Sequence, residues 1–110
     1  MANFFKNSLQ SGIGTAGTVG YTCPPNRTST VIGVSVANVV AADVGVTVKA
    51  HDVSTGTISH VIKSFTVAEG STLVLFGGDQ KLVLETGDFI SITGSSAAAF
   101  DAIVSVLEQG

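Results

Sequence analysis

Two histidines are the first candidates for chemistry in this chain of 110 residues. His51 and His60 lie on the two predicted strands that flank a turn at residues 54–56, so they could be neighbours across a hairpin. A two-histidine metal site would need a third ligand, and the nearest suitable side chain is that of Asp52. No cysteine or glutamate stands at ligand spacing, so the sequence favours a polar pair on a solvent-facing strand. We therefore expect no metal site.

Four carboxylates lie in predicted turns: Glu69, Asp79, Glu85 and Asp88. Carboxylates in turns accept hydrogen bonds from nearby backbone N–H groups, which explains these positions without catalysis. A glycosidase would need two of them in a cleft lined with aromatic side chains, and the chain has no Trp and a single Tyr. The segment 77–79 lacks the spaced oxygen ligands of a calcium loop and is typical of a hairpin turn.

The glycine-rich segment 12–17 imitates a dinucleotide-binding fingerprint only loosely. That motif works between a strand and a helix, and no helix is predicted after it. With two histidines in one small domain, no Ser/His/Asp set can be proposed either. We predict a protein that is not an enzyme and that uses no cofactor.

Composition narrows the class of partner. The formal net charge is −3 and the five basic residues are scattered, which excludes a nucleic-acid binder built on a basic stripe. Only 12% of the residues are charged, against about 25% in a usual soluble domain. With so few charged residues, part of the protein surface should be apolar and buried against other chains. The sequence therefore favours a homo-oligomer or a larger assembly. The alternative is a Ser/Thr-rich monomer kept soluble by uncharged polar groups.

Neither a membrane segment nor a secretion signal is expected. The longest near-apolar stretch, residues 31–42, is interrupted by Ser35 and Asn38 and is shorter than the roughly 20 residues of a spanning helix. The N-terminus lacks the pattern of a signal peptide. The single cysteine, Cys23, cannot form an internal disulfide, so it is predicted to be a small buried hydrophobe.

The remaining pattern predicts an all-β protein. Thirteen glycines, two prolines and many Val, Thr, Ser and Ile residues favour strands and tight turns. We expect one antiparallel β-sandwich or jelly-roll-like domain over residues 1–110, with eight to nine short strands. Residues 1–14 form either an N-terminal arm or the first strand. The other expected strands cover residues 18–23, 30–38, 44–52, 57–67, 73–76, 82–84, 89–92 and 100–107.

The alternation of apolar and polar residues also predicts how strands pair and which side chains share a face. The apolar runs at 73–76, 82–84 and 89–92 are separated by glycine-containing breaks, and they predict an antiparallel meander. The apolar positions of strand 57–67 change face near His60, which indicates a bulge. Two strands are expected to present one apolar face each, formed by Val19, Tyr21 and Cys23 in the first and by Ile32, Val34 and Val36 in the second.

Four apolar residues are candidate interface positions: Phe4, Phe5, Ile103 and Leu107. Phe4 and Phe5 are adjacent, so on an extended chain their rings point to opposite sides and one sheet face cannot bury both. Ile103 and Leu107 lie on the face of the last strand opposite Phe100, Ala102, Val104 and Val106. A strand that is apolar on both faces is either central or part of an interface.

Four segments carry a resemblance to a known group of proteins: YTCPP at 21–25, TVIGVSVAN at 30–38, GGDQKLVLETGD at 77–88 and AIVSVLE at 102–108. With these segments the chain resembles the small structural proteins of tailed bacteriophage particles, particularly those of cyanophages. The similarity runs over nearly the whole chain. It brings no catalytic residues with it.

The resemblance implies a β-sandwich subunit of the virion, assembled in the host cytoplasm and present in many copies. It favours a capsid decoration (cement) protein, commonly a trimer, that binds the major capsid protein on the outer surface and stabilises the head. The alternative is a neck, tail or fibre component that contacts other virion subunits or the host surface. A free carbohydrate-binding module is disfavoured because aromatic stacking platforms are scarce.

Overall fold

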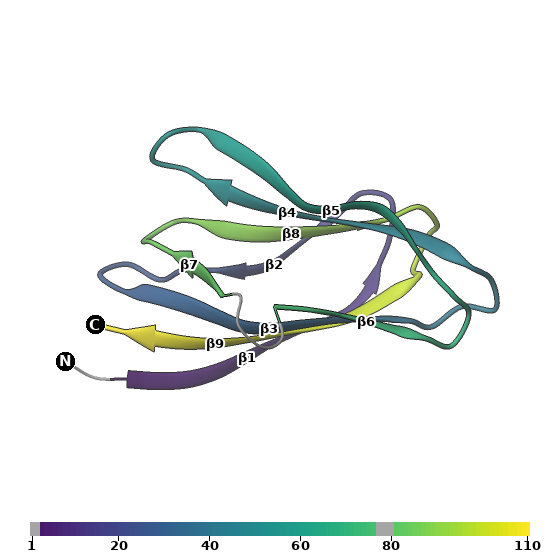
Figure 1. Cartoon of the computed structure of the whole chain (residues 1–110), viewed down its shortest axis with the longest axis horizontal. Helices are drawn as coiled ribbons and strands as arrows, with labels where there is room; N and C mark the ends of the chain where they lie inside the picture. Colours follow the sequence, from purple (N-terminus) through teal and green to yellow (C-terminus); the bar gives the residue numbers. More distant parts are fainter. Residues whose placement is uncertain (1–2, 77–80) are drawn as a thin grey trace.

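A computed structural model describes residues 3–76 and 81–110 and has nine strands in two antiparallel sheets (Figure 1). The strands are β1 (Asn3–Ile13), β2 (Thr18–Thr22), β3 (Thr28–Asn38), β4 (Val44–Asp52), β5 (Thr57–Val67), β6 (Thr72–Leu75), β7 (Leu82–Leu84), β8 (Phe89–Gly94) and β9 (Phe100–Gln109). β3, β8 and β9 are each two residues longer than expected, whereas β5 has the expected bounds. Within the described ranges, no helix has the length and apolar character needed to cross a membrane.

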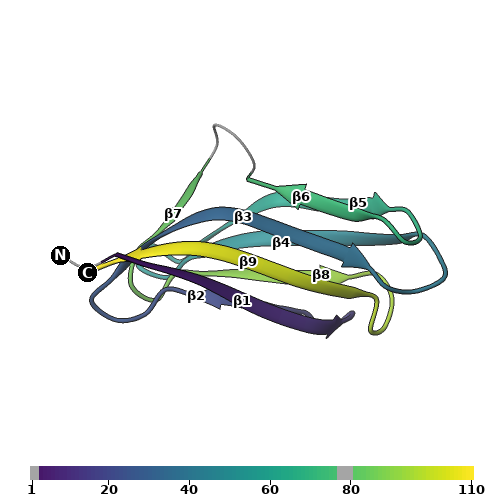
Figure 2. The same ribbon diagram turned by 90° about the horizontal axis from the view of Figure 1, so that it is seen from below.

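The two sheets pack face to face as a sandwich (Figure 2). The five-stranded sheet has the order β1-β9-β3-β6, with β7 also paired to β3, and the four-stranded sheet has the order β2-β8-β4-β5. β7 and β6 lie one after the other along the same edge of β3, so together they occupy one strand position. Counted that way, the order of strands is that of a jelly roll, and the predicted fold class is confirmed.

Alternating side chains of both sheets fill the core. In β9 the residues Phe100, Ala102, Val104 and Val106 are buried, as the alternation predicted. β4 buries Val44, Val46 and Val48 from the other sheet and leaves its remaining side chains half-buried. β3 and β9 are central strands, because each has a partner on both sides.

Two predicted strand faces are each wrong at one residue, Val19 in β2 and Ile32 in β3, and irregular pairing is the cause in both. The register of β2 shifts between Val19 and Tyr21, so Val19 is exposed and does not share the inward face of Tyr21. The register of β3 shifts between Val31 and Gly33, so Val31 enters the core in place of Ile32. A bulge moves every later side chain to the other face, and periodicity alone does not locate it.

The predicted meander is also wrong. β6 and β7 do not pair with each other, because both pair with β3, and β8 belongs to the four-stranded sheet between β2 and β4. The expected hairpin turn at 77–79, with Asp79, lies outside the described residues. The bulge expected near His60 is confirmed, because the pairing of β5 with β4 shifts on both sides of Ile62.

Candidate assembly surface

The outer face of the five-stranded sheet carries the main group of exposed apolar side chains. Five of them are between 45% and 76% exposed: Phe5, Leu9, Val74, Val83 and Ile103. They come from β1, β9, β6 and β7, so three of the four strand positions of the sheet are represented, and β3 contributes none of the five. Exposed apolar residues that gather on one face are typical of binding surfaces.

Strand register arranges these side chains in two rows across the sheet. In the first row the cross-strand partners are, in order, Phe5, Leu107, Thr30 and Val83. In the second row they are Leu9, Ile103, Ser35 and Val74. Directly opposite residues on one face have neighbouring side chains, so each row forms a continuous strip.

The space between the two rows is polar but uncharged. There the hydroxyl of Ser105 on β9 donates to the Oδ1 of Asn7 on β1 at 2.8 Å. At the end of the face, Asp101 accepts a hydrogen bond of 3.1 Å from the backbone N–H of Gly12. Among the described residues of β9 that face outward, Asp101 is the one with a charge, so the central part of this surface is neutral.

The outer face of the four-stranded sheet has a different character. Lys49, His51 and His60 lie there, as expected for the solvent-facing side of β4 and β5. The ring of His51 stacks on Phe89 with centroids 4.1 Å apart, and its Nε2 lies 2.8 Å from the hydroxyl of Ser91. Burial and the nearby Lys49 lower the pKa of His51, so the ring is neutral at pH 7. Val19 and Ile58 are exposed apolar side chains of this face, opposite Ser91 and His51, so the face mixes apolar, polar and charged groups.

The histidine pair considered from the sequence is not assembled as a cross-strand pair. His60 lies opposite Lys49, and His51 lies opposite Ile58. The carboxylate of Asp52 accepts hydrogen bonds from the backbone and side chain of Ser54, which closes the β4–β5 turn. In residues 3–76 and 81–110, no three His, Cys, Asp or Glu side chains are grouped so that they could hold a metal ion.

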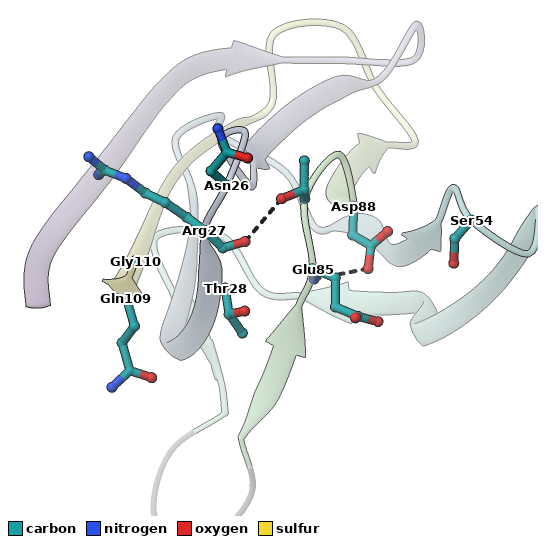
Figure 3. A pocket seen from close by; sticks show the side chains of 9 residues that line it. Asn26, Arg27, Thr28, Ser54, Glu85, Asp88, Gln109 and Gly110 are labelled. Atoms are coloured by element: carbon teal, nitrogen blue, oxygen red, sulfur yellow. Dashed lines mark hydrogen bonds between the residues drawn. The ribbon is translucent and has the colours of Figure 1, made fainter. Parts of the chain in front are cut away.

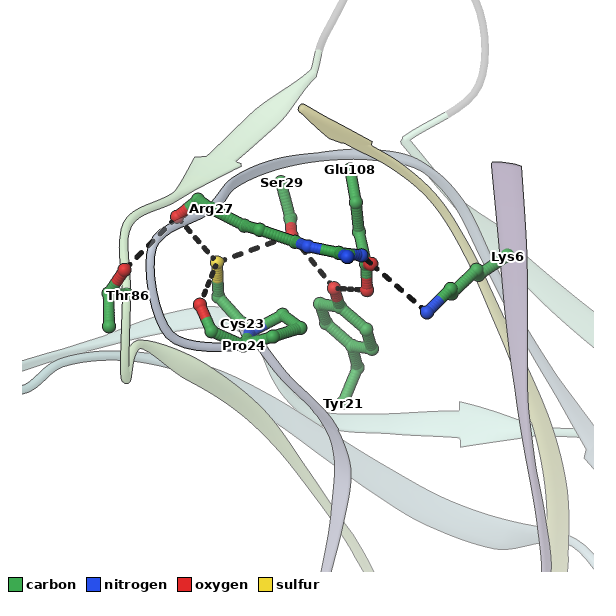
Figure 4. A network of polar contacts seen from close by, with 8 residues as sticks. All are labelled: Lys6, Tyr21, Cys23, Pro24, Arg27, Ser29, Thr86 and Glu108. Atoms are coloured by element: carbon green, nitrogen blue, oxygen red, sulfur yellow. Dashed lines mark hydrogen bonds and ion pairs between the residues drawn. The ribbon is translucent and has the colours of Figure 1, made fainter. Parts of the chain in front are cut away.

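A buried carboxylate that sequence reasoning missed joins β1 to the end of the sandwich (Figure 4). Glu108 on β9 is 1% exposed. Its Oε1 lies 2.6 Å from Nη1 of Arg27 and 3.3 Å from Nζ of Lys6, and its Oε2 accepts a hydrogen bond of 2.5 Å from the Tyr21 hydroxyl. The hydroxyl of Ser29 lies 2.7 Å from that of Tyr21, which completes the cluster.

The charge state of this cluster follows from its contacts. Burial alone would raise the pKa of Glu108, but the hydrogen bonds from Tyr21, Arg27 and Lys6 outweigh burial and lower it. Burial, together with the bond to the Glu108 carboxylate, raises the pKa of Tyr21 far above its ordinary value. Both groups therefore keep fixed charge states near pH 7, Glu108 ionised and Tyr21 neutral, and the cluster is structural.

Cys23 lies beside this cluster. Its Sγ lies 3.2 Å from the backbone oxygen of Arg27 and 3.3 Å from the Ser29 hydroxyl. The side chain is 1% exposed, so the predicted burial of this cysteine is confirmed. A thiol enclosed in this way packs as a small hydrophobe with weak polar contacts.

The four candidate interface residues separate into two groups. Phe5, Ile103 and Leu107 lie on the outer face of the five-stranded sheet, with Phe5 directly opposite Leu107. Phe4 lies on the other side of β1, where the guanidinium carbon of Arg27 stands 4.5 Å from the centre of its ring. The opposite orientations of the two rings agree with the alternation of a strand.

An open pocket of about 510 Å³ lies at the end of the sandwich (Figure 3), and Arg27, the ionic partner of Glu108, is one of the residues that line it. The turn after β7 contributes Glu85 and Asp88, which the sequence had placed in a capping role. Asp88 does cap backbone groups, because its carboxylate accepts hydrogen bonds of 3.1 Å from the N–H groups of Val53 and Glu85. Thr86 donates to the backbone oxygen of Arg27 at 3.2 Å. The polar groups that line the pocket are thus largely used to hold its loops together.

Comparison with known proteins bears on the fold. No protein-family model matches the chain, and no curated protein matches it. A chain of the disulfide-linked pili that form Bacillus endospore appendages is similar, with a TM-score of 0.55 and 15% identity over 97% of this chain and 85% of that one. A chain of the IBDV viral particle has a TM-score of 0.55 and 12% identity, and the structure of PirA has a TM-score of 0.50 and 15% identity.

Coverage differs between these similar structures. The match to the IBDV chain covers 96% of this chain but only 30% of the IBDV chain. The match to PirA covers 90% of this chain and 92% of the PirA chain. At such low identities, the similarity shows a common fold and nothing finer. The jelly-roll sandwich is therefore shared by proteins of different kinds, and function has to be argued from the surface of this chain.

Proposed function

We propose that this chain is a non-enzymatic structural subunit of a virus particle, and that it decorates the outer surface of a capsid. The observation that carries the proposal is the neutral outer face of the five-stranded sheet, with its two rows of exposed apolar side chains. A face of this kind suits attachment to another protein surface, because desolvating it leaves few charges unpaired.

The size of the face supports attachment at a shared, many-copy surface. Four strand positions at about 4.8 Å and ten residues at about 3.3 Å give roughly 19 by 33 Å, or about 600 Å². A standard stable interface buries about 800 Å² on each partner. One copy on its own would therefore hold weakly, and a subunit repeated over a lattice gains from the contacts of its neighbours.

Sequence and fold support the same class of protein. The segments at 21–25, 30–38 and 102–108 resemble those of virion proteins of tailed phages. The jelly roll is a frequent fold of viral coat subunits, although a fold by itself does not assign a function. The sequence favours a homotrimer, but attachment through this face does not depend on the number of copies in the free oligomer. Sedimentation of the purified chain distinguishes a trimer from a dimer or a monomer.

Substitution on the proposed attachment face tests its role. Val74 and Val19 are exposed valines of different sheets, and only Val74 lies on the outer face of the five-stranded sheet. We expect Val74→Lys to lower the amount of chain retained on purified particles, while Val19→Lys, the matched control, leaves it unchanged. Equal retention of both variants would contradict attachment through this face.

The number of copies of this chain in a purified particle tests whether the chain lies on the capsid surface. Decoration predicts a number of copies comparable with that of the major capsid protein. A number far below that would assign the chain to the neck, tail or fibre instead. Quantitative mass spectrometry of the particles, with the major capsid protein as internal standard, makes this distinction. Absence of the chain from the particles would reject a virion role altogether.

A further inference from the structure

β1 leaves a long edge of the five-stranded sheet unpaired in the single chain. It is the terminal strand of this sheet and pairs with β9. Residues 3–10 pair in unbroken register, so this stretch is regular. Its one charged side chain, Lys6, reaches Glu108 inside the sandwich at 3.3 Å. Long, regular edges with few charges are templates for pairing with another strand.

The other sheet edges have features that oppose such pairing. The pairing of β5 with β4 is irregular, and Ser64 has a positive φ of 51°. β2 has five residues and a register shift between Val19 and Tyr21. β6 and β7 have four and three residues. Bulges and short strands protect edges, so among the described strands β1 has the edge best suited to pairing.

We propose that β1 pairs antiparallel with β1 of a second copy of this chain, about a two-fold axis that passes through Asn7. The two five-stranded sheets then form one continuous sheet. A two-fold interface uses the same residues on both copies, which a self-complementary strand allows. The inference goes beyond the proposed function, because it concerns the isolated chain and holds whatever particle the chain belongs to.

The side chains of β1 select this register. With Asn7 on the axis, Phe5 lies opposite Leu9 of the second copy, and this apolar pair occurs twice. Apolar cross-strand pairs stabilise a sheet. Moving the axis to Lys6 would place two ammonium groups opposite each other, which is destabilising. Moving it to Ser8 would place Leu9 opposite Asn7 and leave Phe5 without its apolar partner.

The same register joins the apolar rows of the two copies. The row that ends at Phe5 continues into the row of the second copy that begins at Leu9. The outer face, about 600 Å² in one copy, becomes a single apolar surface of about 1,200 Å² by the same strand dimensions. That area exceeds what a stable interface needs on one partner. Pairing through β1 therefore turns a weak attachment face into an adequate one.

Sedimentation and cysteine cross-linking test the pairing in solution. We expect the purified chain to sediment as a dimer at micromolar concentration. On mild oxidation, Asn7→Cys should form a covalent dimer, because directly opposite residues in an antiparallel pair have Cα atoms about 4.5–5.5 Å apart, within the range of a disulfide. The unchanged chain is the control for Cys23, which is buried.

Ser105→Cys is the matched control for position. Ser105 lies beside Asn7 on the same outer face, one strand further from the axis. In the proposed dimer the two copies of this position are three strand spacings apart, about 14 Å, which is too far for a disulfide. If two copies instead stacked through their outer faces, both variants would cross-link. Cross-linking of Ser105→Cys as readily as Asn7→Cys would therefore overturn the proposal.

A charge exchange tests the register. Leu9→Glu should weaken the dimer on the order of tenfold, because it removes both apolar pairs. Adding Phe5→Lys to Leu9→Glu should restore much of the affinity, because opposite charges then face each other across the axis. A monomer or a trimer in sedimentation of the unchanged chain would overturn the proposal, and so would a double variant that is weaker than Leu9→Glu alone.

Discussion

Glu108→Gln is the substitution that tests most directly what holds β1 to the sandwich. The change keeps the size of the side chain and removes its charge. In the folded chain the carboxylate meets Arg27 at 2.6 Å, Lys6 at 3.3 Å and the Tyr21 hydroxyl at 2.5 Å. A neutral amide accepts fewer and weaker hydrogen bonds at these positions, so both cations lose their ionic partner.

The expected loss of stability follows from these contacts. A hydrogen bond to a charged group contributes about 1.5–3 kcal/mol. The side chains of Lys6 and Arg27 remain 51% and 31% exposed, so water replaces part of what the carboxylate provided and their share must be discounted. We expect the free energy of unfolding to fall by about 2–4 kcal/mol at pH 7. That is a large fraction of the total stability of a domain, about 5–15 kcal/mol.

The pH dependence has a definite sign. Burial alone raises the pKa of Glu108, but its hydrogen bonds outweigh burial, so the folded pKa lies below the usual value of 4.5. The contribution of the carboxylate to stability is therefore complete above about pH 4.5 and is lost as the pH falls through the folded pKa. The difference in stability between the unchanged chain and Glu108→Gln should shrink over that acid range.

Urea denaturation at pH 7 and at several lower pH values measures both effects, with Glu69→Gln as a control on an exposed turn. Hydrogen exchange adds a local readout, because β1 amides should exchange faster in Glu108→Gln than in the unchanged chain. Equal stability of Glu108→Gln and the unchanged chain at pH 7 would refute the argument. A difference that stays constant down to acid pH would refute the assigned charge.

Three further substitutions test the packing. Cys23→Ala should lower the free energy of unfolding by no more than about 1–2 kcal/mol and leave particle binding intact, since the thiol makes only weak polar contacts; loss of binding would show another role. Asn38→Ala should cost about 2–4 kcal/mol in urea denaturation, because the buried side chain bonds three backbone groups. Gly94→Ala should cost about 1–3 kcal/mol by calorimetry, since a Cβ would stand 3.0 Å from the Phe100 ring, whereas Gly33→Ala, with nothing within 4 Å, should be nearly neutral.

Strand positions and the faces of regular strands could be predicted from the sequence. The alternation in β9 gave the correct inward residues, because this strand contributes a regular inward face to a core that admits few polar side chains. Pairing could not be predicted in the same way. β6 and β7 have strand composition, but each is too short to cover β3, and only the length of β3 decides that they lie end to end.

The alternation of apolar residues did not predict the register shifts of β2 and β3 or the partners of the buried Glu108 carboxylate. The shifts after Val19 and Val31 each add one residue to a strand, Gly20 in β2 and Ile32 beside Gly33 in β3. A glycine inside a strand is a weak sign of a bulge, and alternation alone does not use it. Glu108 did leave a signal. It continues the inward alternation of Phe100 to Val106 by two residues, so a carboxylate was due inside the sandwich and needed partners there. Its partners come from positions 6, 21 and 27, which the sequence alone does not bring together.

The Glu108 cluster connects the stability of the fold with the proposed assembly. β1 contributes one fully buried residue to the core, Ile13, and its other positions are exposed or half-buried. It is held instead by β9, by Lys6 on Glu108 and by the Ser8 hydroxyl, which donates to the Gly20 carbonyl at 2.5 Å. A strand held by polar contacts can keep two uncharged apolar side chains on its outer face, because its attachment does not depend on burying them. Lys6 thus anchors β1 to Glu108 and also leaves the outer face of β1 free of charge for another protein.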